Sequence, residues 1–110
     1  KGENYWNGNI KNIAKGNTEV VAEMIGAMTG GELFQVETVK PYAEDYHACV
    51  KEAVSELRVN ARPELKRYLD TLNDYDTIIL GFPNWCGTMP MAMFTFLEHY
   101  DWAGKRVLPF

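Results

Sequence analysis

The sequence has few of the residues that metal sites and disulfide scaffolds need. Its two cysteines, Cys49 and Cys86, do not form a CxxC pair and indicate no zinc site. Its two histidines, His47 and His99, each stand alone, without the neighbouring ligands that a metal site requires. Two isolated thiols fit a reducing cytosol better than a disulfide scaffold. We therefore expect a cytoplasmic protein without a metal centre.

Long apolar runs and excess positive charge are also lacking. No run approaches the roughly 20 apolar residues of a membrane span, and the polar start of the sequence does not resemble a signal peptide. Lysine and arginine number 11 against 15 aspartates and glutamates, and a net charge of −4 lacks the basic footprint of nucleic-acid binding. The sequence therefore predicts neither a membrane protein nor a nucleic-acid partner, whereas an acidic surface suits a basic protein partner.

What the sequence does contain is an alternation of helical and strand patterns. At 110 residues, 46% of them hydrophobic, the chain suits a single domain over residues 1–110. Helical spacing covers residues 17–29, 43–59 and 90–100, and strand-forming runs cover 33–39, 77–82 and 106–110. Residues 1–16 are predicted to be loop, with a short helical turn near 9–14. This order predicts an α/β fold with a parallel sheet covered by helices.

The segment Lys15-Gly16-Asn17-Thr18 stands directly before the first predicted helix and is a candidate anion site. The first turn of a helix has unpaired N–H groups and the positive end of the helix dipole. Glycine lets a ligand approach the backbone closely, and the threonine hydroxyl adds a donor, so the segment suits a phosphate. The alternative is ordinary helix capping, because asparagine and threonine are also good N-cap residues.

The second candidate is the loop Gly81–Met89, which follows the strand-forming run Ile78-Ile79-Leu80. Ligands of open parallel sheets bind at the carboxyl ends of the strands, where this loop and the Gly16 segment would meet. Phe82 and Trp85 offer flat apolar faces, and the glycine-containing backbone offers donors for the edge of a heterocycle. A phosphate-binding site beside a flat aromatic pocket suits a mononucleotide such as FMN. The alternative is a loop folded onto its own aromatic side chains.

These segments together resemble the flavodoxin superfamily, in particular its short FMN proteins. Those proteins carry a strand that leads into a GYP-x-W-W-G-T-x-P loop, which corresponds to Gly81–Pro90 here. Their T-G-N-T phosphate loop is matched by Lys15–Thr18, their proline-tyrosine segment by Pro41–Tyr46, and their N-A-R-P-E-L run by Asn60–Leu65. The resemblance covers roughly residues 15–110.

The resemblance implies non-covalent FMN binding in a flavodoxin-like three-layer sandwich with a parallel sheet. It implies that the phosphate is held by Gly16, Asn17 and Thr18. It also implies that the isoalloxazine ring, faced by Trp85, is lined by Pro83, Asn84, Trp85, Cys86, Gly87 and Thr88. Cys86 stands where the family often has an aromatic residue, and no flanking histidine or cationic residue would make it a nucleophile. No catalytic residue is expected.

Parts of the family's pattern are not matched in this sequence. Residues 1–14 resemble an insertion into the phosphate loop, and the family's first strand and its last loop, strand and helix have no counterpart. In the family, that first strand lies in the centre of the sheet, between the strands that correspond to 33–39 and 77–82. We therefore expect exposed strand edges and apolar surface. A partner chain, a swapped homo-oligomer or residues outside this sequence would cover them, and the sequence does not favour one of the three.

The leading hypothesis is an FMN protein of electron transfer whose acidic surface docks redox partner proteins. One alternative is an NAD(P)H-dependent FMN quinone or nitro reductase, which needs a substrate shelf that the sequence does not reveal. Another is a chain that keeps the scaffold but binds no flavin. Structural roles are expected for Tyr42, Tyr46, Tyr75 and Glu98.

Overall fold

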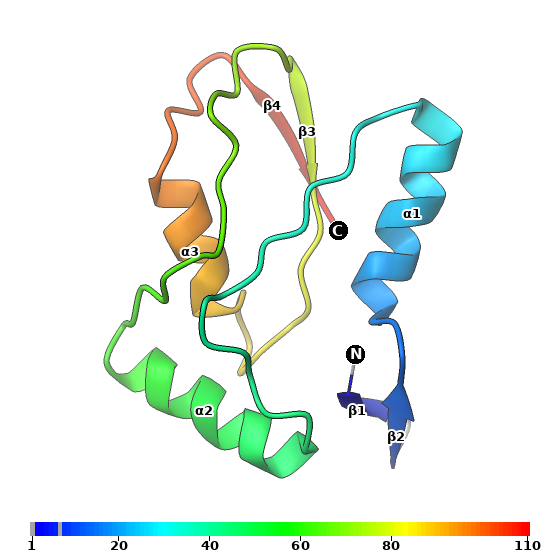
Figure 1. Cartoon of the computed structure of the whole chain (residues 1–110), viewed down its shortest axis with the longest axis vertical. Helices are drawn as coiled ribbons and strands as arrows, with labels where there is room; N and C mark the ends of the chain where they lie inside the picture. Colours follow the sequence, from blue (N-terminus) through cyan, green and yellow to red (C-terminus); the bar gives the residue numbers. More distant parts are fainter. Residues whose placement is uncertain (1, 7) are drawn as a thin grey trace.

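The computed structural model describes residues 2–6 and 8–110. Its elements in chain order are β1 (Gly2–Trp6), β2 (Asn9–Ile13), α1 (Asn17–Thr29), α2 (Tyr46–Arg58), β3 (Thr77–Leu80), α3 (Met91–Glu98) and β4 (Arg106–Pro109). Figure 1 shows β3 and β4 between α1 and α3, with α2 and the β1–β2 hairpin towards one end of the molecule. The fold is α/β with a parallel sheet, as the alternating patterns predicted.

Residues 2–13 form an antiparallel hairpin in which Tyr5 of β1 stands opposite Ile10 of β2. The prediction of a loop with a helical turn near residues 9–14 is therefore wrong. Gly8, in the connection, has a φ of +80°, which is the conformation that tight hairpin turns demand. The Asn7-Gly8 dipeptide is the hairpin signal in the sequence, and it outweighs the weak helical spacing that follows it.

The helices lie where their apolar spacing predicted them, with one boundary corrected. α1 ends at Thr29 and is capped by Gly30, which adopts a φ of +73° and donates its N–H to the Gly26 carbonyl at 2.9 Å. α2 begins at Tyr46 rather than at the predicted Ala43. The reason is the cap: the Asp45 carboxylate accepts a hydrogen bond of 2.8 Å from an N–H of the first turn.

The parallel sheet of the described residues consists of β3 and β4, with Thr77 opposite Arg106 and Leu80 opposite Pro109. The strand predicted over Leu33–Val39 is not formed, and that prediction is wrong. Its pairing is limited to an isolated bridge between Thr38 and Leu65. A strand needs a neighbouring strand to satisfy its backbone groups, and no strand within residues 2–6 and 8–110 pairs with this segment.

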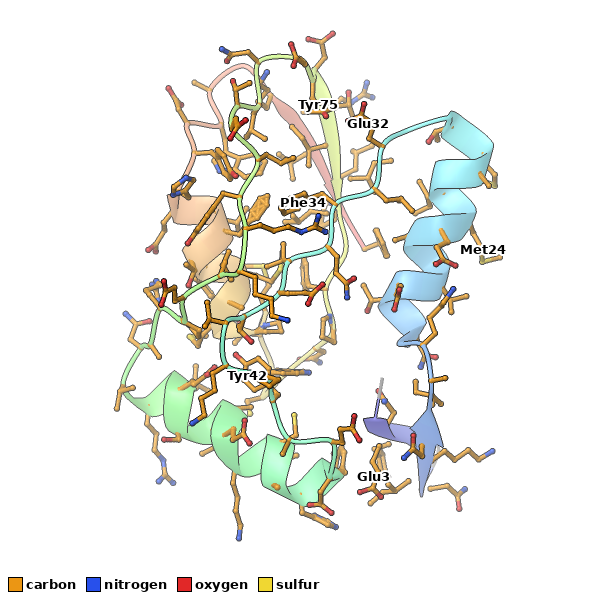
Figure 2. The ribbon with its side chains drawn as sticks, viewed as in Figure 1. Glu3, Met24, Glu32, Phe34, Tyr42 and Tyr75 are labelled. Carbon is orange, nitrogen blue, oxygen red and sulfur yellow. The ribbon has the colours of Figure 1, made fainter. Side chains whose placement is uncertain are left out.

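The core lies between α3 and the coil that follows α2. Its buried hydrophobic residues include Leu65, Leu72, Met91, Ala92, Met93 and Phe96. Phe34, from the segment before α2, points towards this core (Figure 2) and meets the Phe96 ring edge-on, with 5.7 Å between the ring centroids. Burial of these side chains supplies the main stabilising free energy of the domain.

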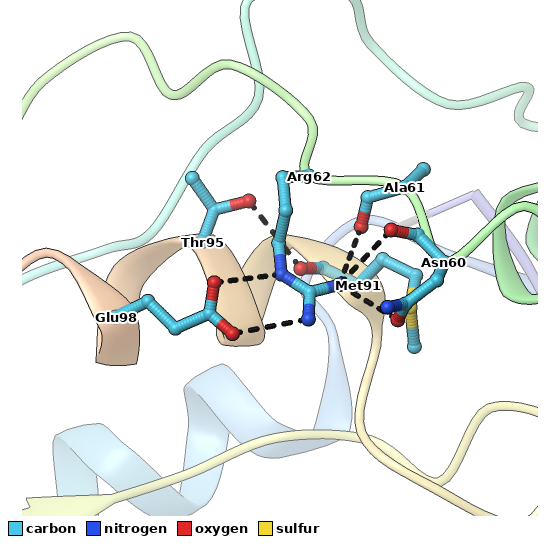
Figure 3. Close-up of polar contacts among 6 residues, drawn as sticks. All are labelled: Asn60, Ala61, Arg62, Met91, Thr95 and Glu98. Atoms are coloured by element: carbon cyan, nitrogen blue, oxygen red, sulfur yellow. Dashed lines mark hydrogen bonds and ion pairs between the residues drawn. The ribbon is translucent and has the colours of Figure 1, made fainter.

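Arg62 ties the coil to α3 (Figure 3). Its Nε and Nη2 donate to the two carboxylate oxygens of Glu98 at 2.9 and 3.0 Å, and its Nη1 donates to Asn60 Oδ1 at 3.0 Å. The guanidinium also lies over the Phe94 ring, 5.1 Å from the centroid. The hydrogen bonds from Arg62 lower the pKa of Glu98. Glu98 therefore holds the coil against α3.

α1 leaves its apolar stripe uncovered by the described residues. None of its residues is buried, and Met24 and Met28 are 61% and 81% exposed. Figure 2 shows Met24 on the side of α1 away from the strands. The expectation of exposed apolar surface is confirmed at this helix. No helix in the described part of the chain is long and apolar enough to cross a membrane.

Candidate functional site

The carboxyl ends of β3 and β4 point towards the end of the molecule where α1 begins (Figure 1). The loop of residues 81–90 leaves β3 at this same end. Both sequence-predicted binding segments therefore lie at the carboxyl edge of the sheet. This is the edge at which open α/β sheets bind ligands.

The first turn of α1 keeps free backbone donors. Gly16 precedes the helix in an extended conformation, with φ −65° and ψ 149°, and no side chain caps this end. The N–H groups of Asn17, Thr18 and Glu19 have no acceptor among the described residues. Unpaired N–H groups at a helix start, with the positive end of the helix dipole behind them, favour an anion.

The Lys15 ammonium group is ion-paired with Glu23 on α1. Its Nζ lies 2.8 Å from both carboxylate oxygens of Glu23, which is in the second turn of α1. This hydrogen bond raises the pKa of Lys15. The anion site proposed from the sequence is thus a site of backbone donors, and its cation is already paired.

The loop after β3 closes on itself in a two-residue turn. Trp85 and Thr88 exchange both backbone hydrogen bonds, at 2.8 and 3.1 Å. Between them, Cys86 and Gly87 have φ values of +53° and +83°, the combination of a type I′ turn. Positive φ strains a residue that has a Cβ, and such strain in a native structure is concentrated at functional sites. Cys86 lies exposed at the tip of this turn.

Trp85 packs against a tyrosine from a distant part of the chain. The Tyr42 ring meets the indole edge-on, with 4.8 Å between centroids and an interplanar angle of 90°. The Tyr42 hydroxyl donates to Glu56 Oε2 at 2.8 Å, and burial together with this bond raises the pKa of Tyr42. The sequence predicts a structural role for Tyr42. Its place in the proline-tyrosine segment of the resemblance was the signal that it belongs near this loop.

Gly81 marks a close approach between the start of the loop and the segment after β4. A Cβ added at Gly81 would lie 2.3 Å from Cζ of Phe110. The backbone of Phe110 is held there because its N–H donates to the Leu80 carbonyl at 2.9 Å. Only glycine therefore leaves room for the ring.

The β1–β2 hairpin lies beside the start of α1 and contacts the start of α2. The Glu3 N–H donates to the Glu44 carbonyl at 2.8 Å, and the Glu3 carboxylate accepts from the Tyr46 N–H at 3.2 Å. The opposite side of the hairpin borders a hollow of about 460 Å³ beside the start of α1, lined by Asn4, Lys11, Ile13 and Asn17. The hairpin thus lies between the first turns of α1 and α2.

Other chemistry is not assembled in the described residues. No group of three or more His, Cys, Asp or Glu side chains within residues 2–6 and 8–110 could hold a metal ion. Cys49 on α2 is half-buried, and burial raises the pKa of its thiol, with Glu52 and Glu56 adding to the effect. A thiol held in its protonated form is a poor nucleophile.

The predicted site residues therefore fall into two sets at one edge of the sheet. Gly16, Asn17 and Thr18 form the start of α1. The loop set consists of Pro83, Asn84, Trp85, Cys86, Gly87 and Thr88. That these residues bind a flavin stays a prediction.

The sequence profile of the family described as Flavodoxin matches residues 11–110. This chain belongs to the flavodoxin family. The flavodoxin match begins within β2, so β1 lies outside it. No curated protein is similar enough to the chain to count as a match.

Two crystal structures are similar to this flavodoxin-family chain, both of proteins assigned as flavoproteins. The protein from Bacteroides eggerthii DSM 20697 is 30% identical, with a TM-score of 0.78 and a match covering 89% of this chain and 64% of that chain. The protein from Bacteroides uniformis ATCC 8492 is 33% identical, also with a TM-score of 0.78, over 89% of this chain and 65% of that one. This chain therefore spans slightly less than two thirds of those relatives.

Proposed function

We propose that the chain binds FMN and takes part in electron transfer. The observation that carries the proposal is that two features lie at the same edge of a flavodoxin-family sheet. They are the unpaired N–H groups at the start of α1 and the loop that contains Trp85. The similarity to proteins assigned as flavoproteins supports a flavin as the cofactor. The backbone donors at Asn17, Thr18 and Glu19 suit a phosphate, which favours FMN among the flavins.

The residues present fit such a cofactor. Within the loop, the N–H groups of Asn84, Cys86 and Gly87 have no acceptor among the described residues. They are available to the polar edge of an isoalloxazine ring, while the Trp85 indole offers an apolar face. Bound FMN supplies the redox chemistry, and the protein supplies binding, orientation and electrostatics.

No side chain at this edge needs to act as an acid, a base or a nucleophile in the proposed role. The residues of the chain bind the cofactor, orient its ring and exclude water from one of its faces. A net charge of −4 favours docking to a basic redox partner protein. Free cysteines at positions 49 and 86 are in keeping with the proposed cytoplasmic location.

The test compares FMN with riboflavin, which lacks the phosphate. Each flavin is titrated into the wild type while flavin fluorescence is followed. Charge-assisted hydrogen bonds at the start of α1 should make FMN bind about tenfold tighter or better. Gly16→Glu places a carboxylate at this position without backbone strain, because φ is −65°. It should weaken FMN binding and leave riboflavin binding nearly unchanged.

Equal affinities for FMN and riboflavin in the wild type would contradict phosphate binding at the start of α1. No binding of either flavin would contradict the proposed function. A second assay separates a carrier from a reductase: NADPH oxidation is followed with a quinone as acceptor. Slow NADPH oxidation together with fast electron exchange with a protein partner is the outcome expected here.

A further inference from the structure

Trp85 has a backbone that the turn already fixes. Its N–H and C=O both pair with Thr88, and the two residues between them hold the αL conformation. The orientation of the indole is then decided by its side-chain torsions alone. The Tyr42 ring, 4.8 Å away and perpendicular to the indole, limits those torsions.

Tyr42 is in turn held by α2. Its half-buried ring carries a hydroxyl that donates to Glu56 Oε2 at 2.8 Å. The neighbouring Ala43 N–H donates to Glu52 Oε1 at 3.2 Å, one turn earlier on the same helix. Figure 2 shows Tyr42 above α2. The ring is therefore anchored at its hydroxyl and beside its backbone, both to carboxylates of a single helix.

We propose that Tyr42, anchored by Glu56, is a positioning residue that sets the orientation of the Trp85 indole at the cofactor site. The inference rests on the proposed function, since the indole faces the flavin there. Edge-to-face pairs have a defined geometry that a purely apolar contact lacks. A ring held in one orientation binds its ligand without first losing torsional freedom.

The experiment uses three variants of the full chain. Tyr42→Leu removes the ring and the hydroxyl, and Tyr42→Phe removes the hydroxyl alone. Tyr46→Phe is the matched control on the same segment, because its hydroxyl has no hydrogen bond to a described residue. Thermal unfolding of each variant shows whether the domain stays folded.

Two measurements are made on each variant. The first, without flavin, is fluorine NMR of 5-fluorotryptophan, with the Trp85 signal assigned by Trp85→Phe. The second is the FMN titration. For Tyr42→Leu we expect the Trp85 signal to shift and broaden, and FMN binding to weaken about threefold to tenfold. Tyr42→Phe should have a smaller effect on both, and Tyr46→Phe should match the wild type.

The outcomes separate the two proposals. If the wild type binds no FMN, the proposed function fails, and the positioning role at a cofactor site fails with it. If the wild type binds FMN but Tyr42→Leu binds it equally well, the positioning role alone is overturned. An unmoved Trp85 signal in Tyr42→Leu would overturn it as well, because the indole would then not depend on Tyr42.

Discussion

Gly81 allows a sharp test of how tightly β3, β4 and the loop after β3 are packed. A methyl group at this position would lie 2.3 Å from Cζ of Phe110 and 2.8 Å from both of its Cε atoms. These distances are below any van der Waals contact, so Gly81→Ala must displace the ring. The Phe110 backbone is fixed by its bonds to Leu80 and Phe82, at 2.9 and 3.2 Å. The ring therefore has to rotate towards solvent and lose part of its burial.

Phe110 is already 37% exposed and only its ring has to move, so the expected cost is about 1 kcal/mol, the lower end of the range for overpacked positions. This is a measurable share of the roughly 5–15 kcal/mol that stabilises a small domain. In a urea titration followed by circular dichroism, it corresponds to a midpoint lowered by about 0.5 M. Gly87→Ala is the matched control, because its Cβ would meet no atom within 4 Å while its φ of +83° adds strain alone.

The assignment of the cost to the clash is tested by a double-mutant cycle with Phe110→Ala. Because that change removes the ring, the double variant should lose less stability than the sum of the two single variants. Additive losses, or a Gly81→Ala variant as stable as the wild type, would refute the packing at this position.

Three other predictions concern the helices and the core. The cap hydrogen bond lowers the pKa of Asp45. The stability that this carboxylate contributes is therefore complete above its unfolded pKa near 4 and is lost as the pH falls through the lower folded value. Asp45→Asn keeps the cap, so the free energy of unfolding of this variant should depend less on pH in this range. Glu3→Ala should speed exchange of the Tyr46 amide about fivefold in hydrogen-exchange NMR, because the carboxylate that accepts from this amide is removed. Unchanged exchange would contradict the hydrogen bond between Glu3 and Tyr46. Phe96→Ala should cost about 3–5 kcal/mol in urea unfolding, since the ring is 5% exposed and packs against Phe34; a loss below about 1 kcal/mol would place it outside the core.

The helices could be predicted because their information is local. The apolar spacing from Val20 to Met28 placed α1, and Gly30 placed its end. The same spacing did not reveal what covers the stripe, and in the structure no described residue buries it. Periodicity shows which face of a helix is apolar, but the partner of that face depends on the rest of the fold.

The strands were harder to predict because their information is not local. Leu33–Val39 has the composition of a strand, yet a strand exists only beside another strand. The segment has an isolated bridge at Thr38, and Phe34 instead packs into the α3 core. The hairpin shows the opposite case, because its signal in the sequence is local: an Asn-Gly dipeptide stands between the two strands.

The composition of the loop after β3 has a separate physical reason at each position. Gly81 makes room for Phe110, whereas Gly87 supplies the positive φ of the turn. Neither glycine needs a ligand to explain it. Trp85 is different, because its ring is oriented by Tyr42, a residue far away in the sequence that is itself anchored to α2. Local spacing could therefore identify the loop as a candidate site but could not identify the residue that orients its aromatic ring. That residue follows from the tertiary contact between the segment before α2 and the loop after β3.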